Sequence, residues 1–258
     1  MRKLLKILAL IPVLYLIVLP VYLASSTNSK PCGGIIIDIK DSSEYHFVTR
    51  KQLLNLAYGN SSKILGQPIK SIKLNEIENR VSVLRELKFA EVYRTIDGNI
   101  HIYADQRAPV MRLMPDSGGD YFLDEDGVVV RRRNLYTPRL HIVGGNINIS
   151  SAMLDGVSVL DTSIKNTILR DVYELVNYIN DDDFWSAQID QIYVDDNNDI
   201  DLIPRVGNQT VHLGTIENFK GKLRNLEAFY DKVLPEVGWN KYSVINLEFK
   251  DQIVCKKR

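Results

Sequence analysis

An uncharged apolar segment near the N-terminus is the feature that most limits how this chain folds. Three cations lie within residues 1–6, and no charged residue occurs from Ile7 to Asn28. The most apolar part, residues 7–24, has the length that a helix needs to cross a bilayer. Because flanking cations stay in the cytoplasm, we predict a cytoplasmic tail at residues 1–6, a transmembrane anchor at 7–24 and an exported remainder.

A cleavable signal peptide is the alternative interpretation of the same segment. Ala24 and Ser26 would then be the small residues that precede the cleavage site. The apolar region of a signal peptide usually spans about 7–15 residues, and this segment is longer. Its length therefore favours an anchor that is not cleaved.

Residues 35–106 have the pattern of a small β-α-α-β-β domain. A short apolar strand, GIIIDI, is followed by two amphipathic helices. Thr49 with Gln52 has the spacing of a capping box, and a second capping box predicts a helix that starts near Asn75. The segment FAEVYRTIDGNIHIYADQ then has two alternating runs around an Asp-Gly pair, which is a strong hairpin signal. We expect both helices to cover one face of a three-stranded sheet.

Residues 107–258 are predicted to form a second, β-rich domain. Pro109 suits a strand start or a domain junction, because proline cannot donate to a sheet. Short alternating runs and turns follow, together with two amphipathic helices within SIKNTILRDVYELVNYI and TIENFKGKLRNLEAFYDKVL. We predict a mainly antiparallel sheet with helices packed on one face, which makes the fold α+β.

The chain ends on YSVINLEFKDQIVCKKR, in which polar and apolar residues alternate. This period of two is typical of a half-buried strand. Because only four residues follow Val254, we expect the segment to be the last strand of the sheet, with one side open to another chain.

Motifs of catalysis and metal binding are not found in the sequence. It contains no GxxxxGK, GxSxG or HExxH motif, and the four histidines are scattered, which favours strand-face residues over a metal cluster. The run DDNNDID, residues 195–201, lacks the Gly and Glu of a calcium loop and is predicted to be a hairpin turn. The acids of DEDG, residues 124–127, are interpreted as a solvated turn. We therefore assign no catalytic, cofactor-binding or metal-binding residue.

Composition excludes two further classes of protein. Lys+Arg and Asp+Glu both number 32, whereas nucleic-acid binders rely on clustered cationic surface. A hydrophobic content of 45% excludes a disordered chain. Two cysteines, Cys32 and Cys255, would lie in an oxidising compartment where a disulfide is permitted; their spacing leaves both a bridge and two free thiols open.

In their order along the chain, several motifs resemble the bacterial cell-division protein family FtsQ, also called DivIB. Residues 35–106 are similar to a POTRA domain, with Gln106, Arg107 and Pro109 at its ERxP-like junction and Gln106 in place of the usual acid. YFLDEDGVV is similar to the family's YLVDxxGxV, and VHLG with the helix after it to LGxxxxxxKL. VINLEFKDQIVC is similar to the final IDLRYxxxxVV, with Asn246 for the usual Asp.

The resemblance implies a non-enzymatic, single-pass scaffold in the inner membrane at the division site, with most of the chain in the periplasm. Such proteins link early and late division proteins and hold FtsB and FtsL in a complex of three, with no cofactor, nucleic acid or small-molecule substrate. In the family, FtsB adds a strand to the C-terminal edge of the β domain, a known mode of peptide recognition. Transferred to this sequence, the partner site comprises Phe249, Asp251, Gln252 and Ile253, together with Lys257. The POTRA-like module is expected to bind other division proteins through residues 81–92.

Two alternatives remain open. A POTRA-bearing component of an envelope export or assembly machine would share the small module, although too little chain follows Gln106 for a β-barrel with its loops. A membrane-tethered periplasmic enzyme would require a convergent pocket with perturbed carboxylates.

Overall fold

The structure is a computed structural model that describes residues 15–16, 18–19, 30–59, 64–133, 136, 138–165, 167–250 and 252–258. The predicted tail at 1–6 lies outside the described residues, as does the predicted anchor at 7–24 apart from residues 15–16 and 18–19. In the described part of the chain, no helix has the length and apolarity to cross a membrane. The chain divides into two compact units, residues 1–106 and 107–258, and each is treated by itself.

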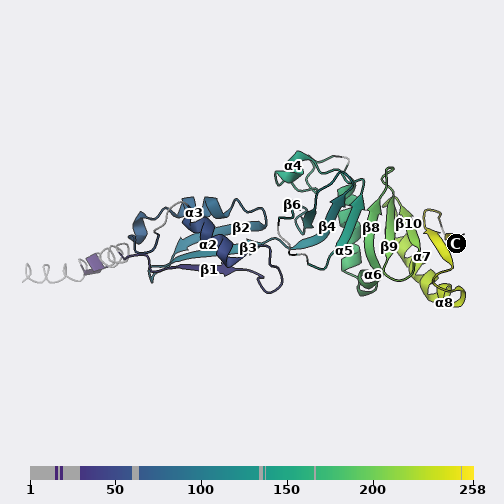
Figure 1. Ribbon diagram of the computed structural model, residues 1–258, viewed down its shortest axis with the longest axis horizontal. Coiled ribbons are helices and arrows are strands. Elements are labelled where there is room, and N and C mark those ends of the chain that lie inside the picture. The colour runs from purple at the N-terminus through teal and green to yellow at the C-terminus, as the bar shows by residue number, and fades with distance from the viewer. Residues whose placement is uncertain are drawn as a thin grey trace, which may run out of the picture. The chain divides into compact units, whose positions relative to one another are not determined.

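The first unit is a three-stranded sheet with two α-helices (Figure 1). Its strand order is β1-β3-β2, with β1 parallel and β2 antiparallel to β3. The β-α-α-β-β order is the one that the sequence predicts. Along the chain the elements are β1 (Ile35–Ile39), α2 (Arg50–Tyr58), a 3-10 helix (Ile69–Ser71), α3 (Leu74–Val81), β2 (Leu87–Arg94) and β3 (Ile100–Gln106).

Both helices of this unit cover the same face of its sheet, as expected. Leu53 and Ala57 of α2 are buried, as are Ile77 and Val81 of α3. They belong to the same buried core as the inward residues of the strands, Ile37, Val92, Ile100 and Ile102. The opposite face is more open and carries two ring pairs, Phe89 with Tyr103 and Tyr93 with His101.

Local capping decides the start of one helix but not of the other. Thr49 precedes α2, and its hydroxyl accepts a hydrogen bond from the backbone N–H of Gln52 at 3.2 Å, as predicted. The capping box predicted for the second helix is wrong, because α3 begins before Asn75 and has no side-chain cap. Glu78 instead accepts from the backbone N–H of Val92 on β2 at 3.2 Å. A tertiary contact therefore takes the carboxylate that the local pattern assigned to capping.

Replacing the cap of α2 tests this assignment. We expect Thr49→Ala to destabilise the helix start by about 1 kcal/mol, because the N–H of Gln52 loses its acceptor. Thr49→Ser keeps a hydroxyl and should leave stability nearly unchanged. Hydrogen exchange of the α2 amides in the full-length protein measures the difference, and equal protection in both variants would contradict it.

Gln106, which replaces an acid in the resembled junction, is buried at the end of β3 and bonds to the loop after β1. Its side chain amide donates to the carbonyls of Lys40 at 3.2 Å and Tyr45 at 3.0 Å, and its oxygen accepts from the N–H of Val48 at 3.1 Å. An ionised carboxylate has no proton to donate. The amide is therefore the group that this loop between β1 and α2 requires.

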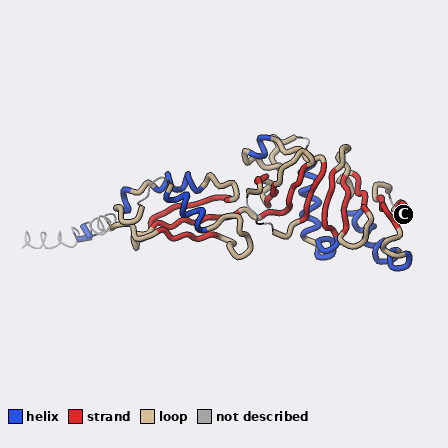
Figure 2. Tube along the Cα trace, in the orientation of Figure 1, coloured by secondary structure: helices blue, strands red, loops and turns tan. Residues whose placement is uncertain are grey.

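The second unit contains one nine-stranded sheet and its helices (Figures 1 and 2). It begins with three strands joined by tight turns, and longer connections that contain the helices follow. Its elements are β4 (Pro109–Pro115), β5 (Tyr121–Asp124), β6 (Val129–Arg131), β7 (His141–Gly145), α4 (Ser151–Leu154), α5 (Ile168–Asn180), α6 (Asp183–Gln188), β8 (Ile189–Val194), β9 (Ile200–Pro204), β10 (Thr210–Gly214), α7 (Phe219–Lys232), α8 (Leu234–Val237), β11 (Tyr242–Asn246) and β12 (Val254–Lys257).

The sheet is mixed, so the prediction of a mainly antiparallel sheet is only partly right. The strand order is β12-β11-β10-β9-β8-β7-β4-β5-β6. Three neighbouring pairs are parallel, namely β4–β7, β7–β8 and β10–β11, and the other five are antiparallel. Helices connect β7 to β8 and β10 to β11, and such crossovers place the second strand parallel to the first.

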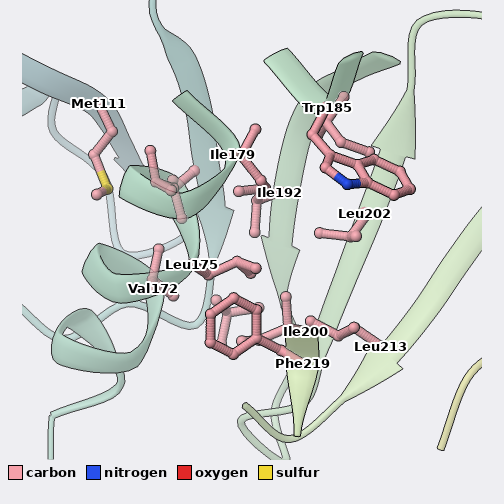
Figure 3. Packing of buried hydrophobic residues seen from close by; sticks show 14 of the residues in the cluster. Met111, Val172, Leu175, Ile179, Trp185, Ile192, Ile200, Leu202, Leu213 and Phe219 are labelled. Carbon is pink, nitrogen blue, oxygen red and sulfur yellow. The ribbon is translucent and has the colours of Figure 1, made fainter. Parts of the chain in front are cut away.

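One hydrophobic cluster lies between the sheet and the helices. Alternate residues of the central strands point into it, including Ile192, Leu202 and Leu213, and α5 and α7 supply Leu175 and Phe219 (Figure 3). The predicted inward faces of both amphipathic helices are confirmed. The buried residues of those faces are Val172, Leu175 and Ile179 in α5, and Phe219, Leu223 and Leu226 in α7.

The DEDG turn joins β5 to β6, but its first acid is not solvated as predicted. Asp124 is 1% exposed. Its carboxylate accepts from the Arg107 guanidinium at 2.6 Å and from the backbone N–H groups of Asp126 at 3.0 Å and Val128 at 2.6 Å. Burial raises the pKa of Asp124, the hydrogen bonds from the Val128 N–H and the Arg107 guanidinium oppose this rise, and the charge of Asp126 adds to it. The residue is thus part of the core of the second unit.

Candidate functional site

The C-terminal segment forms a hairpin, and the prediction of one continuous last strand is wrong. β11 pairs with β10 on one side and antiparallel with β12 on the other. β12, the yellow strand beside the C-terminus in Figure 1, is the terminal strand of the sheet. The open edge therefore belongs to residues 254–257, and the chain itself covers the edge of β11.

Asn246 ends β11 by forming a side-chain turn. Its side chain oxygen accepts from the backbone N–H of Glu248 at 2.8 Å, and its amide donates to the Glu248 carboxylate at 3.1 Å. Asn and Asp form such turns readily and compete with strand continuation. The sequence contained a signal for this turn, because Asn246 occupies the place of an Asp in the resembled motif.

The backbone of β12 presents hydrogen-bonding groups to the open edge. The N–H of Arg258 donates to the carbonyl of Lys241 at 3.4 Å and so points toward the preceding strand. Because backbone groups alternate between the two sides of a strand, the N–H of Lys256 also points inward. The N–H and carbonyl groups of Cys255 and the N–H of Lys257 therefore point away from β11, whereas the Lys257 carbonyl accepts from the Ser243 hydroxyl of β11 at 3.4 Å.

The predicted site residues lie in two different places. Phe249, 48% exposed, and Gln252, also exposed, lie in the connection between the two strands, and Ile253 packs partly against the core. Lys257 is exposed on β12 itself. Asp251 lies outside the described residues.

A groove of about 680 Å³ runs between this connection and α7. Phe249, Gln252 and Ile253 line it from the connection, and Asn218, Lys222 and Asn225 line it from the start of α7. The structure thus brings three of the predicted residues together with a helix surface that the sequence analysis missed. Polar residues on a helix carry no local signal of which segment they face, so this pairing was not visible in the sequence.

The open edge is basic and carries a thiol. Lys256, Lys257 and Arg258 are exposed at its end. Cys255 is partly buried on β12, and burial raises the pKa of its thiol. Cys32, in the first unit, is buried, and both cysteines are free thiols rather than a disulfide.

A histidine lies among acids beside the connection. His212 of β10 has its Nδ1 atom 2.7 Å from the Asp201 carboxylate and its Nε2 atom 3.3 Å from the Glu248 carboxylate. Partial burial lowers the pKa of His212, but the hydrogen bond to Asp201 and the charges of Asp201, Glu248 and Asp199 outweigh it, so the pKa is raised overall. His212 lies on a strand face, as expected, but it is surrounded by acidic side chains.

Comparison with protein families identifies both parts of the chain. Residues 108–256, more than half of the chain, match the family described as FtsQ/DivIB, C-terminal related. Residues 30–105 match the POTRA-like domain family. No curated protein matches the chain. The two matched ranges correspond to the two compact units.

Proposed function

Because the chain belongs to the FtsQ/DivIB family, we propose that it is a non-enzymatic scaffold of the bacterial division machinery. The POTRA-like domain that precedes the family region supports the same role. In this proposal residues 7–24 anchor the protein in the cell membrane at the division site, and the rest of the chain lies on the outer side.

The scaffold docks a partner of the FtsB/FtsL type by strand addition to β12. The observation that carries this step is the edge at β12, where no further strand pairs within the described residues and the N–H groups of Cys255 and Lys257 point away from β11. Strand addition draws its affinity from such groups and its specificity from alternate side chains. Lys257 therefore contributes through its backbone as well as its charge.

The side chains around the edge define the chemistry of the partner. The exposed cations Lys256, Lys257 and Arg258 favour an acidic docking strand. Phe249 and the groove beside α7 offer an apolar contact next to the same edge. An acidic strand that also carries a large apolar side chain fits both features. Gln252, Ile253 and Asp251 complete the site in this proposal.

The POTRA-like unit supplies a second contact for other division proteins. Its region 81–92 includes exposed Val83 and Phe89, and apolar side chains exposed on a surface favour protein contacts. An export or assembly machine that uses a POTRA module is the competing function, and the family match over residues 108–256 favours division.

Photocrosslinking in cells tests the docking proposal. A photoreactive amino acid at Phe249 or at Lys257 should yield adducts with a small single-pass division protein. Arg131 is the matched control, because it is an exposed residue of β6, the terminal strand at the other edge of the same sheet. Adducts from Arg131 but not from Phe249 or Lys257 would place the partner elsewhere. A fluorescent fusion that spreads evenly around the envelope would contradict the division role itself.

A further inference from the structure

Three potential metal ligands converge at the sheet of the second unit, beside the start of α7. They are Asp199 from the β8–β9 turn, His212 from β10 and Glu248 from the connection after β11, and one ligand atom of each lies within 4.8 Å of the others. Val211 and Leu213, on either side of His212, are fully buried in the core. The imidazole of His212 therefore points to the other face of the sheet, and this side chain is 23% exposed.

The hydrogen bond between His212 and Asp201 leaves the Nε2 atom of His212 as the nitrogen that can bind a metal ion. A carboxylate only accepts hydrogen bonds, so the Nδ1 atom, 2.7 Å from Asp201, carries a proton. By the same argument the Nε2 atom, 3.3 Å from a carboxylate oxygen of Glu248, carries a proton when no ion is bound, and a metal ion would displace that proton and bind the Nε2 lone pair in its place. Metal-binding histidines usually have such a carboxylate behind them, which sets the tautomer and the ring orientation.

The spacing fits a small metal ion. Ligand distances of about 2.0–2.1 Å in tetrahedral zinc sites place neighbouring ligand atoms about 3.3 Å apart. The Nε2 atom of His212 and the Glu248 oxygen are already at 3.3 Å. The Asp199 carboxylate lies within 4.8 Å of both, so a short side-chain movement brings it to the same ion.

The local charge also favours a dication. Asp199, Asp201 and Glu248 place three carboxylates around His212. Lys222 supplies one positive charge nearby, since its ammonium interacts with Glu248 and Asp199 while it donates to the carbonyls of Leu213 and Thr215 at 2.8 Å each. This excess of carboxylates over cations would attract a divalent cation.

We propose that Asp199, His212 and Glu248 bind a divalent transition-metal ion of the zinc type, with Asp201 as the positioning residue. Imidazole with carboxylates suits zinc and its neighbours better than calcium or magnesium, which prefer oxygen ligands. The open side leaves a position for water. The proposal departs from the expectation that the sequence contains no metal site, and it does not depend on the proposed division role.

A bound ion would connect three segments that are far apart in sequence. Glu248 begins the connection that carries Phe249, so the ion would link this connection to β10 and to the β8–β9 turn. The position of the connection would then depend on the metal.

The test is zinc binding to the full-length protein, purified in detergent without a histidine tag and stripped with a chelator. Calorimetric titration with zinc chloride should give one saturable site, and magnesium chloride should not compete. We expect Glu248→Gln and His212→Gln each to weaken zinc binding at least about tenfold. Glu217→Gln is the matched control, because Glu217 is an exposed acid in the adjoining β10–α7 loop with the same loss of charge.

The outcomes separate the alternatives. Zinc should raise the melting temperature of the wild type and of Glu217→Gln but not of Glu248→Gln, which removes an exposed charge and should fold normally. No saturable binding by the wild type would mean that a proton, and not a metal, lies between His212 and Glu248. Binding that is unchanged in Glu248→Gln and His212→Gln would place the zinc at another site. Either result overturns the proposal.

Discussion

Lys257→Pro is expected to weaken binding of the partner strand by about ten- to a hundredfold, whereas Lys257→Ala should change it by less than about threefold. Proline removes the N–H that points to the open edge of β12, and the partner carbonyl that it would have bonded is left unpaired at a cost of about 1–3 kcal/mol. Alanine keeps that N–H and loses only an exposed charge. The inward groups of Lys256 are untouched in both variants, so the hairpin with β11 should persist.

Calorimetric binding of the full-length protein to the exported part of an FtsB-type protein measures this difference. Circular dichroism and melting curves of both variants confirm that the fold is intact. An equal loss of affinity in both variants would mean that the partner contacts the Lys257 side chain and not its backbone N–H. Unchanged affinity in Lys257→Pro would exclude strand addition at β12.

Asp124→Ala is expected to lower the free energy of unfolding of the second unit by about 3–5 kcal/mol, because it breaks a buried ion pair and removes the acceptor of two backbone N–H groups. The change removes the acceptor for the Arg107 guanidinium and for two backbone N–H groups, at Asp126 and Val128. The side chain of Asp124 is almost completely buried, so water cannot replace the lost acceptor without opening the turn between β5 and β6.

Urea unfolding of the full-length protein, followed by the fluorescence of buried Trp185 in the second unit, gives the difference in stability. Asp126→Ala is the control, since it removes an exposed carboxylate from the same turn and keeps the N–H that donates to Asp124. We expect it to stay within about 0.5 kcal/mol of the wild type. A similar small effect for Asp124→Ala would show that the Arg107 pair contributes little to the fold.

Sequence patterns predicted the structure correctly where it depends on residues that are close together in the chain. The Asp-Gly turn between β2 and β3, the hydroxyl of Thr49 at the start of α2 and the apolar stripes of α5 and α7 all act within a few residues. For the same reason the order β-α-α-β-β could be predicted for the first unit without knowledge of any distant contact.

Patterns failed where a residue has a distant partner. The sequence shows Asp124 beside other acids and a glycine, which is typical of a solvated turn, but Arg107 from the start of β4 lies against it. Glu78 matches a capping position, yet its carboxylate bonds to β2. Phe249 and Lys257 were predicted to lie on one strand, but they lie on two different segments.

The sequence by itself determined the order of strands and helices in the first unit and the apolar faces of α5 and α7, because alternation and helical periodicity are properties of consecutive residues. Only the tertiary structure decided which strands are neighbours, since helical crossovers make β7–β8 and β10–β11 parallel pairs. It also decided that Asn246 turns the chain back, so that β12 and not β11 is the open edge. The convergence of Asp199, His212 and Glu248 follows from the same pairings. Their positions are far apart in sequence, and only the sheet brings them within reach of a single ion.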